Sequence, residues 1–265
     1  MIGLGRIVYR EENKKMNKLK YVIIDSHRNM TAKRKESLKT FFTEVKNIDD
    51  QAAQNQVGFC DWFERENAVK WFETIVYEGC CVIGYLRCMR NPKDDTQWFI
   101  GDVHVRKEYR GKGIASRMYE KTIDTVMEFE AAENIIASVH PKNINSVGLH
   151  KKMGFKNTRH VCRFPNFWFD EEETEYKKML YKFMPVPADE LAVEKLLPLW
   201  IKYTIPKGTE PDKDKEIKKL GKILEKAQKG EYLFEAIWCG NRLVGIRYNI
   251  GDGEKTYGIK QRRNA

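Results

Sequence analysis

The stretch from Arg110 to Ala115, which reads Arg-Gly-Lys-Gly-Ile-Ala, constrains the fold more than any other part of the chain. It follows an apolar run at residues 98–105 that is typical of a buried strand, and it precedes residues 113–130, where apolar side chains recur at helical spacing. Glycines at 111 and 113 allow a sharp turn and a close approach of the backbone to a ligand. Because the first amides of a helix lack intrahelical partners, the sequence predicts a cradle for phosphate oxygens at this turn.

The composition is that of a globular chain with enough apolar residues for a core. The chain has 265 residues, of which 42% are hydrophobic. No apolar run approaches the roughly 20 residues that a membrane helix needs, so we expect no membrane association. Residues 1–17 are charged and lack the apolar segment of a secretion signal, so we predict a disordered leader, with Met16 as an alternative start.

Cysteine and charge patterns exclude several classes of function. The six cysteines form no CxxC pair and have no histidine at metal-ligand spacing, so we expect reduced thiols, no metal site and a cytoplasmic location. The formal net charge of +10 suits an anionic partner. No clustered basic helix with base-reading residues accompanies this charge, so nucleic-acid binding is not predicted.

The hydrophobic pattern predicts a first domain at residues 18–185 of mixed α/β class. The predicted elements are a strand at 18–25, a helix at 30–48 capped by Thr31, a short helix within 49–68, a hairpin of 72–77 and 81–89, a strand at 98–105, a helix at 113–130, a strand at 135–139, a helix at 145–153 and strands at 155–164 and 176–183. Gly154 follows the last helix as a left-handed stop. Pro185 and Pro187 mark the boundary of this domain.

The pattern restarts in residues 186–265 with two helices and a hairpin. Phe234-Glu235-Ala236-Ile237 and Leu243-Val244-Gly245 match Phe72-Glu73-Thr74-Ile75 and Val82-Ile83-Gly84 at almost equal spacing. One interpretation is a partial second copy of the first domain that stops before any glycine-rich loop. The alternative is a chance likeness, since apolar hairpins resemble each other.

Two signatures, in order, resemble those of the GCN5-related N-acetyltransferases, the GNAT superfamily, over residues 19–184. The family's loop has the form Gln/Arg-x-x-Gly-x-Gly/Ala, which Arg110, Gly113 and Ala115 match. Further on, Asn143 precedes Leu-His-Lys-Lys-Met-Gly-Phe at residues 149–155, which resembles the family's Asn followed by Leu-Tyr-x-x-x-Gly-Phe. The resemblance implies the acyl-CoA N-acyltransferase fold, a mixed and mostly antiparallel sheet flanked by helices, with a smaller C-terminal α+β segment added. It also implies an enzyme that moves acetyl from acetyl-CoA to an amine.

The resemblance further implies which residues hold acetyl-CoA, whose several phosphates also suit the net charge. Loop amides would bind the pyrophosphate. Main-chain groups of the preceding strand would pair with the pantetheine arm, at a bulge where that strand splays from its neighbour. Asn143 would hydrogen-bond the arm or support its neighbours. The expected cofactor-binding residues are Val103, His104, Val105, Arg110, Gly111, Lys112, Gly113, Ile114, Ala115, Ser116 and Asn143.

His150 and Asp102 are the catalytic candidates. His150 stands where the family has a tyrosine that protonates the thiolate of departing CoA, which either an imidazolium or a neutral N–H donor can replace. The alternative is a histidine that only packs in its helix. Where relatives carry a base, this chain has Phe99 and Gly101, and strand alternation turns Asp102 to the opposite face. Asp102 is a base only if a bulge reverses that alternation. Otherwise water relays the proton to a more distant carboxylate, or the amine arrives partly deprotonated.

Aromatic residues next to carboxylates mark the expected acceptor side. Trp62, Phe63, Trp168 and Asp170 are the candidate substrate-binding residues, since aromatic rings and carboxylates attract a cationic amine. The alternative is core packing for the rings and a solvated acidic turn.

The leading interpretation is direct transfer of acetyl to a small-molecule amine in a ternary complex, because no cysteine has an activated setting. The alternatives are a non-catalytic CoA-binding or regulatory module and a protein N-terminal or lysine acetyltransferase. We expect a monomer or a homodimer.

Overall fold

The structure is a computed structural model that describes residues 19–186, 192–205, 209–250 and 253–257. The chain divides into two compact units, Met1–Met179 and Leu180–Ala265. The leader expected at residues 1–17 lies outside the described residues. Within the described ranges, no helix is long and apolar enough to cross a membrane.

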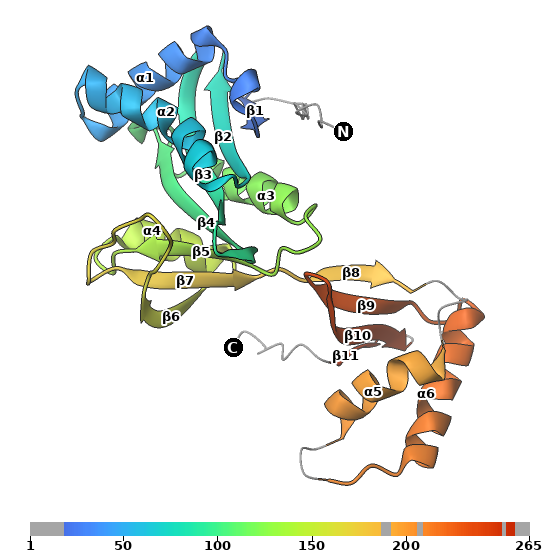
Figure 1. The fold of residues 1–265 in the computed structure, drawn as a ribbon. Coiled ribbons are helices and arrows are strands. Elements are labelled where there is room, and N and C mark those ends of the chain that lie inside the picture. Colours follow the sequence, from blue (N-terminus) through green and yellow to red (C-terminus); the bar gives the residue numbers. More distant parts are fainter. Residues whose placement is uncertain (1–18, 187–191, 206–208, 251–252, 258–265) are drawn as a thin grey trace. The chain divides into compact units, whose positions relative to one another are not determined.

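A seven-stranded sheet forms the first unit, in the order β1-β2-β3-β4-β5-β7-β6. Its strands are β1 (Leu19–Ile24), β2 (Trp71–Glu78), β3 (Cys81–Asn91), β4 (Asp94–Val105), β5 (Asn134–Val139), β6 (Lys156–Val161) and β7 (Thr174–Met179). β4 and β5 pair in parallel, and the other neighbouring strands pair antiparallel. The predicted class, a mixed and mostly antiparallel sheet flanked by helices, is confirmed (Figure 1).

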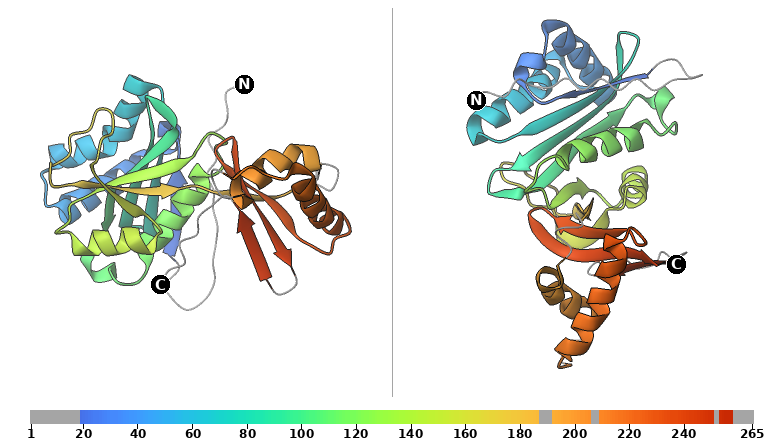
Figure 2. Two further views of the ribbon diagram at one scale, coloured as in Figure 1. Left: turned by 90° about the horizontal axis from the view of Figure 1, so that it is seen from below. Right: turned by 90° about the vertical axis from the view of Figure 1, so that its right-hand side faces the viewer.

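Helices cover both faces of this sheet. The helices are α1 (Ala32–Lys46), α2 (Asp50–Asn67), α3 (Ile114–Val126) and α4 (Ile144–Lys152), with short 3-10 turns at His27–Asn29 and Lys107–Tyr109. The right panel of Figure 2 shows α1 and α2 on one side of β1 to β4 and α3 on the other side. The end of β4 and the start of α3, where the glycine loop lies, are therefore held by packing on two faces.

Local sequence explains where these helices begin. The Thr31 side chain accepts a hydrogen bond from the Arg34 amide and begins α1, as predicted. Asp49 does the same for α2 through the Ala52 amide. α2 continues to Asn67 and is much longer than the short helix predicted there, because Ala53, Val57, Cys60 and Phe63 give it one continuous buried face.

Two strand predictions differ from the structure. β4 begins at Asp94 rather than Trp98, because β3 and β4 form a tight hairpin that pairs Asn91 with Asp94. The final strand expected at 176–183 is divided, since β7 ends at Met179 and β8 (Lys182–Pro185) pairs with β9 in another sheet.

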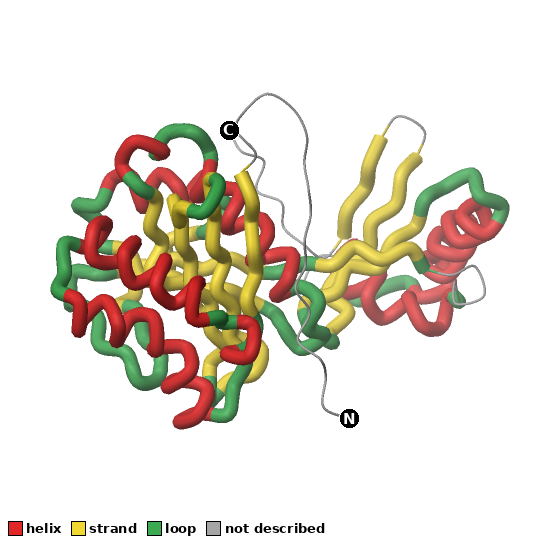
Figure 3. The backbone as a smooth tube through the Cα atoms, turned by 90° about the horizontal axis from the view of Figure 1, so that it is seen from above, coloured by secondary structure: helices red, strands yellow, loops and turns green. Residues whose placement is uncertain are grey.

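The second unit has a four-stranded sheet in the order β11-β10-β9-β8. Figure 3 shows the strands of this unit in yellow and its helices in red. Its further elements are α5 (Val193–Thr204), α6 (Lys213–Gln228), β9 (Phe234–Cys239), β10 (Arg242–Ile250) and β11 (Gly253–Tyr257). Leu196 and Trp200 of α5 pack with Leu220 and Leu224 of α6 in its core.

The described elements of this unit repeat the order found at the start of the chain. In both cases a strand and two helices precede three antiparallel strands, and the two sheets have matching strand orders. A cross-strand pair also recurs, since Glu73 lies opposite Arg87 and Glu235 lies opposite Arg247. The interpretation as a partial second copy stays a prediction, as does the boundary near Pro185.

Candidate active site

A cavity of ≈ 550 Å³ lies beside the end of β4, the glycine loop, the start of α3 and α4. Every residue that we predicted to bind the cofactor lines this cavity, except Lys112. The lining residues are Val103, His104, Val105, Tyr109, Arg110, Gly111, Gly113, Ile114, Ala115, Ser116, Tyr119, Asn143, Asn145, Ser146, Leu149 and Lys152. The two sequence signatures therefore meet at one cavity, although they lie far apart in the chain.

The loop backbone requires glycine at two places. Gly111 and Gly113 have φ angles of +76° and +79°, which side-chain-bearing residues rarely adopt. No atom lies within 4 Å of the place that a Cβ would take at either glycine, so the space beside the backbone is open. Arg110 closes the loop by donating from Nε to the carbonyl oxygen of Val105 at 2.9 Å. The Lys112 ammonium lies over the Tyr109 ring instead of lining the cavity.

The two central strands separate next to this loop. β4 pairs with β5 only between residues 97–99 and 134–136. Beyond that point residues 103–105 line the cavity, so this edge of β4 faces the cavity rather than a neighbouring strand. An open strand edge that leads to a helix N-terminus fits an extended arm that ends in phosphates. The residues present therefore fit acetyl-CoA, as the sequence resemblance implied.

Asn143 has a structural role at the cavity wall. Its side chain accepts a hydrogen bond from the Ser146 amide at 3.1 Å and so begins α4. This contact corresponds to the supporting role that was one of its two expected roles.

His150 is buried and hydrogen-bonded at both ring nitrogens. Its side chain is 3% exposed, and Nδ1 lies 2.8 Å from the carbonyl oxygen of Ser146. Since a carbonyl only accepts, Nδ1 carries the proton, and Nε2 accepts from the Tyr119 hydroxyl at 2.7 Å. Burial lowers the pKa of His150, and the Ser146 contact opposes this only in part, so the ring is neutral.

Tyr119, not His150, lines the cavity. Of the hydrogen-bonded pair, the tyrosine is therefore the member at the cavity wall. The sequence analysis missed Tyr119, because it is one of several buried residues on the inner face of α3 and no motif marks it.

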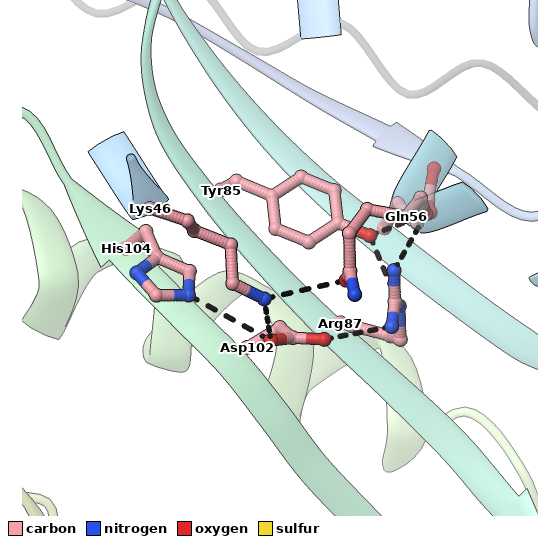
Figure 4. Close-up of polar contacts among 7 residues, drawn as sticks. Lys46, Gln56, Tyr85, Arg87, Asp102 and His104 are labelled. Carbon is pink, nitrogen blue, oxygen red and sulfur yellow. Dashed lines mark hydrogen bonds and ion pairs between the residues drawn. The ribbon is translucent and has the colours of Figure 1, made fainter. Parts of the chain in front are cut away.

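A bulge at Asp102 reverses the alternation of β4. Tyr85 pairs with His104 but Arg87 pairs with Gly101, so β4 has one extra residue, and Asp102 takes a φ of +51°. Asp102 therefore faces α1, where its carboxylate accepts from Lys46 Nζ at 2.8 Å and from Arg87 at 2.7 Å (Figure 4). The sequence analysis missed both cations, although a charged residue inside the apolar run of β3 was a signal for Arg87.

The four acceptor candidates lie in different environments. Phe63 is fully buried within an aromatic cluster with Phe59 and Phe164, an environment that favours the alternative of core packing, and its expected contact with substrate stays a prediction. Trp62 is partly exposed, and Trp168 is 99% exposed. Asp170 accepts from the Glu172 amide in an exposed turn.

All six cysteines are free. None of them is among the described residues that line the cavity. Cys60, Cys88, Cys162 and Cys239 are buried, whereas Cys80 and Cys81 are exposed. Burial raises the pKa of the Cys162 thiol to about 12 and raises those of Cys60 and Cys88 as well. A raised pKa disfavours the thiolate that a nucleophilic cysteine needs.

Two sequence comparisons find similarity to acetyltransferases. The sequence model of the acetyltransferase (GNAT) family matches residues 33–155. An L-2,4-diaminobutyric acid acetyltransferase of Marinococcus halophilus is 26% identical over 140 residues, which are 49% of this chain and 76% of that protein.

Solved structures of similar chains include two acetyltransferases of the GNAT family. The one from Staphylococcus aureus Mu50 is 19% identical, with a TM-score of 0.45 over 60% of this chain and 99% of that chain. The one from Bacillus anthracis is 18% identical, with a TM-score of 0.44 over 60% and 94% of the two chains.

Proposed function

We propose that the chain moves acetyl from acetyl-CoA to a small-molecule amine, by direct transfer in a ternary complex, since residues 33–155 match the sequence model of the acetyltransferase (GNAT) family. The observation that carries the donor side is the cavity where the glycine loop, the open edge of β4 and Asn143 meet. Loop amides from Gly111 to Ser116 would hold the pyrophosphate, and the main chain of residues 103–105 would hold the pantetheine arm.

The cysteines support direct transfer over an acyl-enzyme. A covalent intermediate needs an activated nucleophile at the donor site. Three of the four buried thiols have raised pKa values. Among the residues that the structure describes, no cysteine lines the cavity. The amine therefore attacks the thioester itself in the proposed reaction.

A small-molecule acceptor is supported by the diaminobutyric acid acetyltransferase that resembles this chain. Trp62, Trp168 and Asp170 stay our candidates for acceptor binding, since their side chains reach the surface. An aromatic ring and a carboxylate together suit a cationic amine. The cytoplasmic location, the absence of a nucleic-acid partner and the monomeric or homodimeric state stay predictions.

The departing sulfur needs a proton, and we propose that it comes from the hydrogen-bonded pair of Tyr119 and His150. His150 keeps the role of acid that we expected for it, with the Tyr119 hydroxyl as the group through which the proton reaches the cavity. The neutral resting state of His150 means that it must gain a proton during each turnover.

Thiol release from acetyl-CoA across a panel of amines tests the proposed function. The panel contains L-2,4-diaminobutyrate, polyamines, amino sugars, and peptides with free N-termini or lysines. We expect turnover with at least one small amine, and initial rates whose double-reciprocal lines intersect as a ternary complex requires. Parallel lines would contradict direct transfer. Tight CoA binding without turnover would indicate a regulatory module, and turnover with peptides alone would indicate a protein acetyltransferase.

A further inference from the structure

A histidine on β4 stands next to a carboxylate that other side chains hold in place. His104 lines the cavity, and its side chain is 27% exposed. Its Nε2 lies 3.7 Å from Oδ1 of Asp102. Figure 4 shows this nitrogen turned toward Asp102 and the other ring nitrogen, Nδ1, turned away from the charged cluster.

Asp102 is anchored from two elements. Lys46, the last residue of α1, donates to Oδ1 at 2.8 Å, and Arg87 of β3 donates to Oδ2 at 2.7 Å. Arg87 is itself held, because it is 2% exposed and donates to the Tyr85 hydroxyl and to the carbonyl oxygen of Gln56. The carboxylate therefore cannot turn away from His104 without breaking contacts to two cations.

These cations also keep Asp102 ionised. Burial alone would raise the pKa of Asp102, but the Arg87 guanidinium, the contact with His104 and the Lys46 ammonium lower it more. The net pKa lies well below the usual range of an aspartate. A carboxylate that binds protons so weakly is a poor base, but it is a permanent acceptor for an imidazole N–H.

From this arrangement we propose that His104 is the general base that takes the proton of the acceptor amine, with Asp102 as its positioning residue. At 3.7 Å the contact is an electrostatic one, and the negative carboxylate favours a proton on Nε2, which leaves the other nitrogen, Nδ1, as the proton acceptor. The negative charge of Asp102 stabilises the imidazolium that forms. The sequence analysis assigned His104 only to binding the pantetheine arm, because relatives carry the base at the positions of Phe99 and Gly101.

The inference rests on the proposed function and completes its proton balance. The amine nitrogen forms a bond to the thioester carbon, and its proton passes to Nδ1 of His104. The carbon–sulfur bond breaks, and its electron pair stays on sulfur, which takes a proton from the pair of Tyr119 and His150. One acetylated amine and one free thiol result, the proton on His104 returns to solvent, and the pair of Tyr119 and His150 regains one proton from solvent.

Among the residues that the structure describes, the groups around His104 offer no better base. Lys46 of α1 and Arg87 of β3 are cations, and Tyr85, its register partner on β3, is buried with a raised pKa. Across the cavity, Lys152 of α4 and Arg110 are further cations. Asp102 is the carboxylate in contact with His104, and the cations hold it.

Turnover of full-length His104→Gln and Asp102→Asn as a function of pH tests the proposal, with saturating acetyl-CoA and an amine that the wild type acetylates. His104→Gln should lose about 10²-fold or more in kcat near pH 7 and regain rate log-linearly as pH rises, because the amine then arrives deprotonated. CoA affinity, measured by calorimetry, should not change. Asp102→Asn should also lose kcat near pH 7 and regain it as pH rises, since the imidazolium loses its counter-charge. His160→Gln, on the exposed face of β6, is the matched control and should behave as the wild type does.

The other possible results contradict either the role of His104 or the proposed function, and they can be told apart. A His104→Gln enzyme with wild-type rate and pH profile overturns the role of His104 and leaves the acetyltransferase proposal standing. A loss that high pH does not recover, together with lost CoA affinity, shows that His104 only shapes the cavity. A wild type that binds CoA and acetylates no amine overturns the proposed function itself. If thermal unfolding shows that His104→Gln does not fold, His104→Asn and the Asp102→Asn profile decide the question.

Discussion

The Tyr119 hydroxyl of α3 donates a hydrogen bond to Nε2 of His150 on α4, with 2.7 Å between the two atoms. Because Tyr119 lines the cavity and His150 lies behind it, both variants of the pair should affect the chemical step. We expect Tyr119→Phe and His150→Gln each to lower kcat by about 10²-fold, with the KM for acetyl-CoA little changed. Steady-state kinetics measure this, with His160→Gln as the control. Unchanged turnover in both variants would mean that this pair does not supply the proton.

Burial of His150 also predicts a pH dependence of stability. The folded-state pKa is lowered, whereas the unfolded chain takes up a proton near pH 6.5, so the unfolded state binds more protons below that pH. The contribution of His150 is therefore fully present above about pH 6.5 and is lost as pH falls through the folded pKa, with a slope of up to about 1.4 kcal/mol per pH unit. Urea titrations measure the free energy of unfolding at a series of pH values from about 7.5 to about 5. This free energy should fall less over that range for His150→Gln than for the wild type. An equal decline in both proteins would count against a buried neutral histidine.

Gly113 should be intolerant of any side chain. At a φ of +79°, alanine costs about 1–2 kcal/mol of backbone strain and displaces the amides that begin α3. We expect Gly113→Ala to weaken acetyl-CoA binding by about tenfold or more in calorimetry. Gly58→Ala, inside α2 with open space at its Cβ and no positive φ, is the matched control and should bind normally. Equal affinity in the two variants would show that this loop is not the phosphate cradle.

Trp168 and Asp170 test the acceptor side. Because Trp168 is 99% exposed, truncating it removes almost no packing, so a kinetic effect would report a contact with substrate. We expect Trp168→Ala and Asp170→Ala each to raise the acceptor KM by about three- to tenfold, which corresponds to a cation–π or surface charge contact. Val161→Ala, another exposed apolar residue in the first unit, serves as the control. If neither variant changes the acceptor KM, Trp168 and Asp170 belong to a solvated turn that does not contact the acceptor.

The cavity that we propose for the acetyl donor was predictable from the sequence, because the main chain forms much of it. Gly111, Gly113 and Asn143 act through backbone conformation and capping, which depend on local residue type. The alternation of apolar residues likewise predicted most strands and the helix that follows the loop. Local residue patterns did not predict features that depend on tertiary contacts. These features are the length of α2 and the division of the last predicted strand between two sheets.

The catalytic side was predictable only in part. Asp102 was named with the condition that a bulge reverses β4, and that bulge exists. Its anchors Lys46 and Arg87 come from other elements, so no spacing rule along the chain connects them with Asp102. Tyr119 was hidden for the same reason, since its partner His150 lies 31 residues away on another helix.

The stoichiometry of the products tests acetyl transfer to an amine most directly. The full-length protein is incubated with acetyl-CoA and the amine that releases thiol fastest. Free CoA thiol is followed by a colorimetric reagent, and the amine is followed by mass spectrometry. We expect one acetylated amine for each free thiol, at a rate proportional to enzyme concentration. Thiol release without an acetylated amine, or CoA binding without either product, would contradict the account.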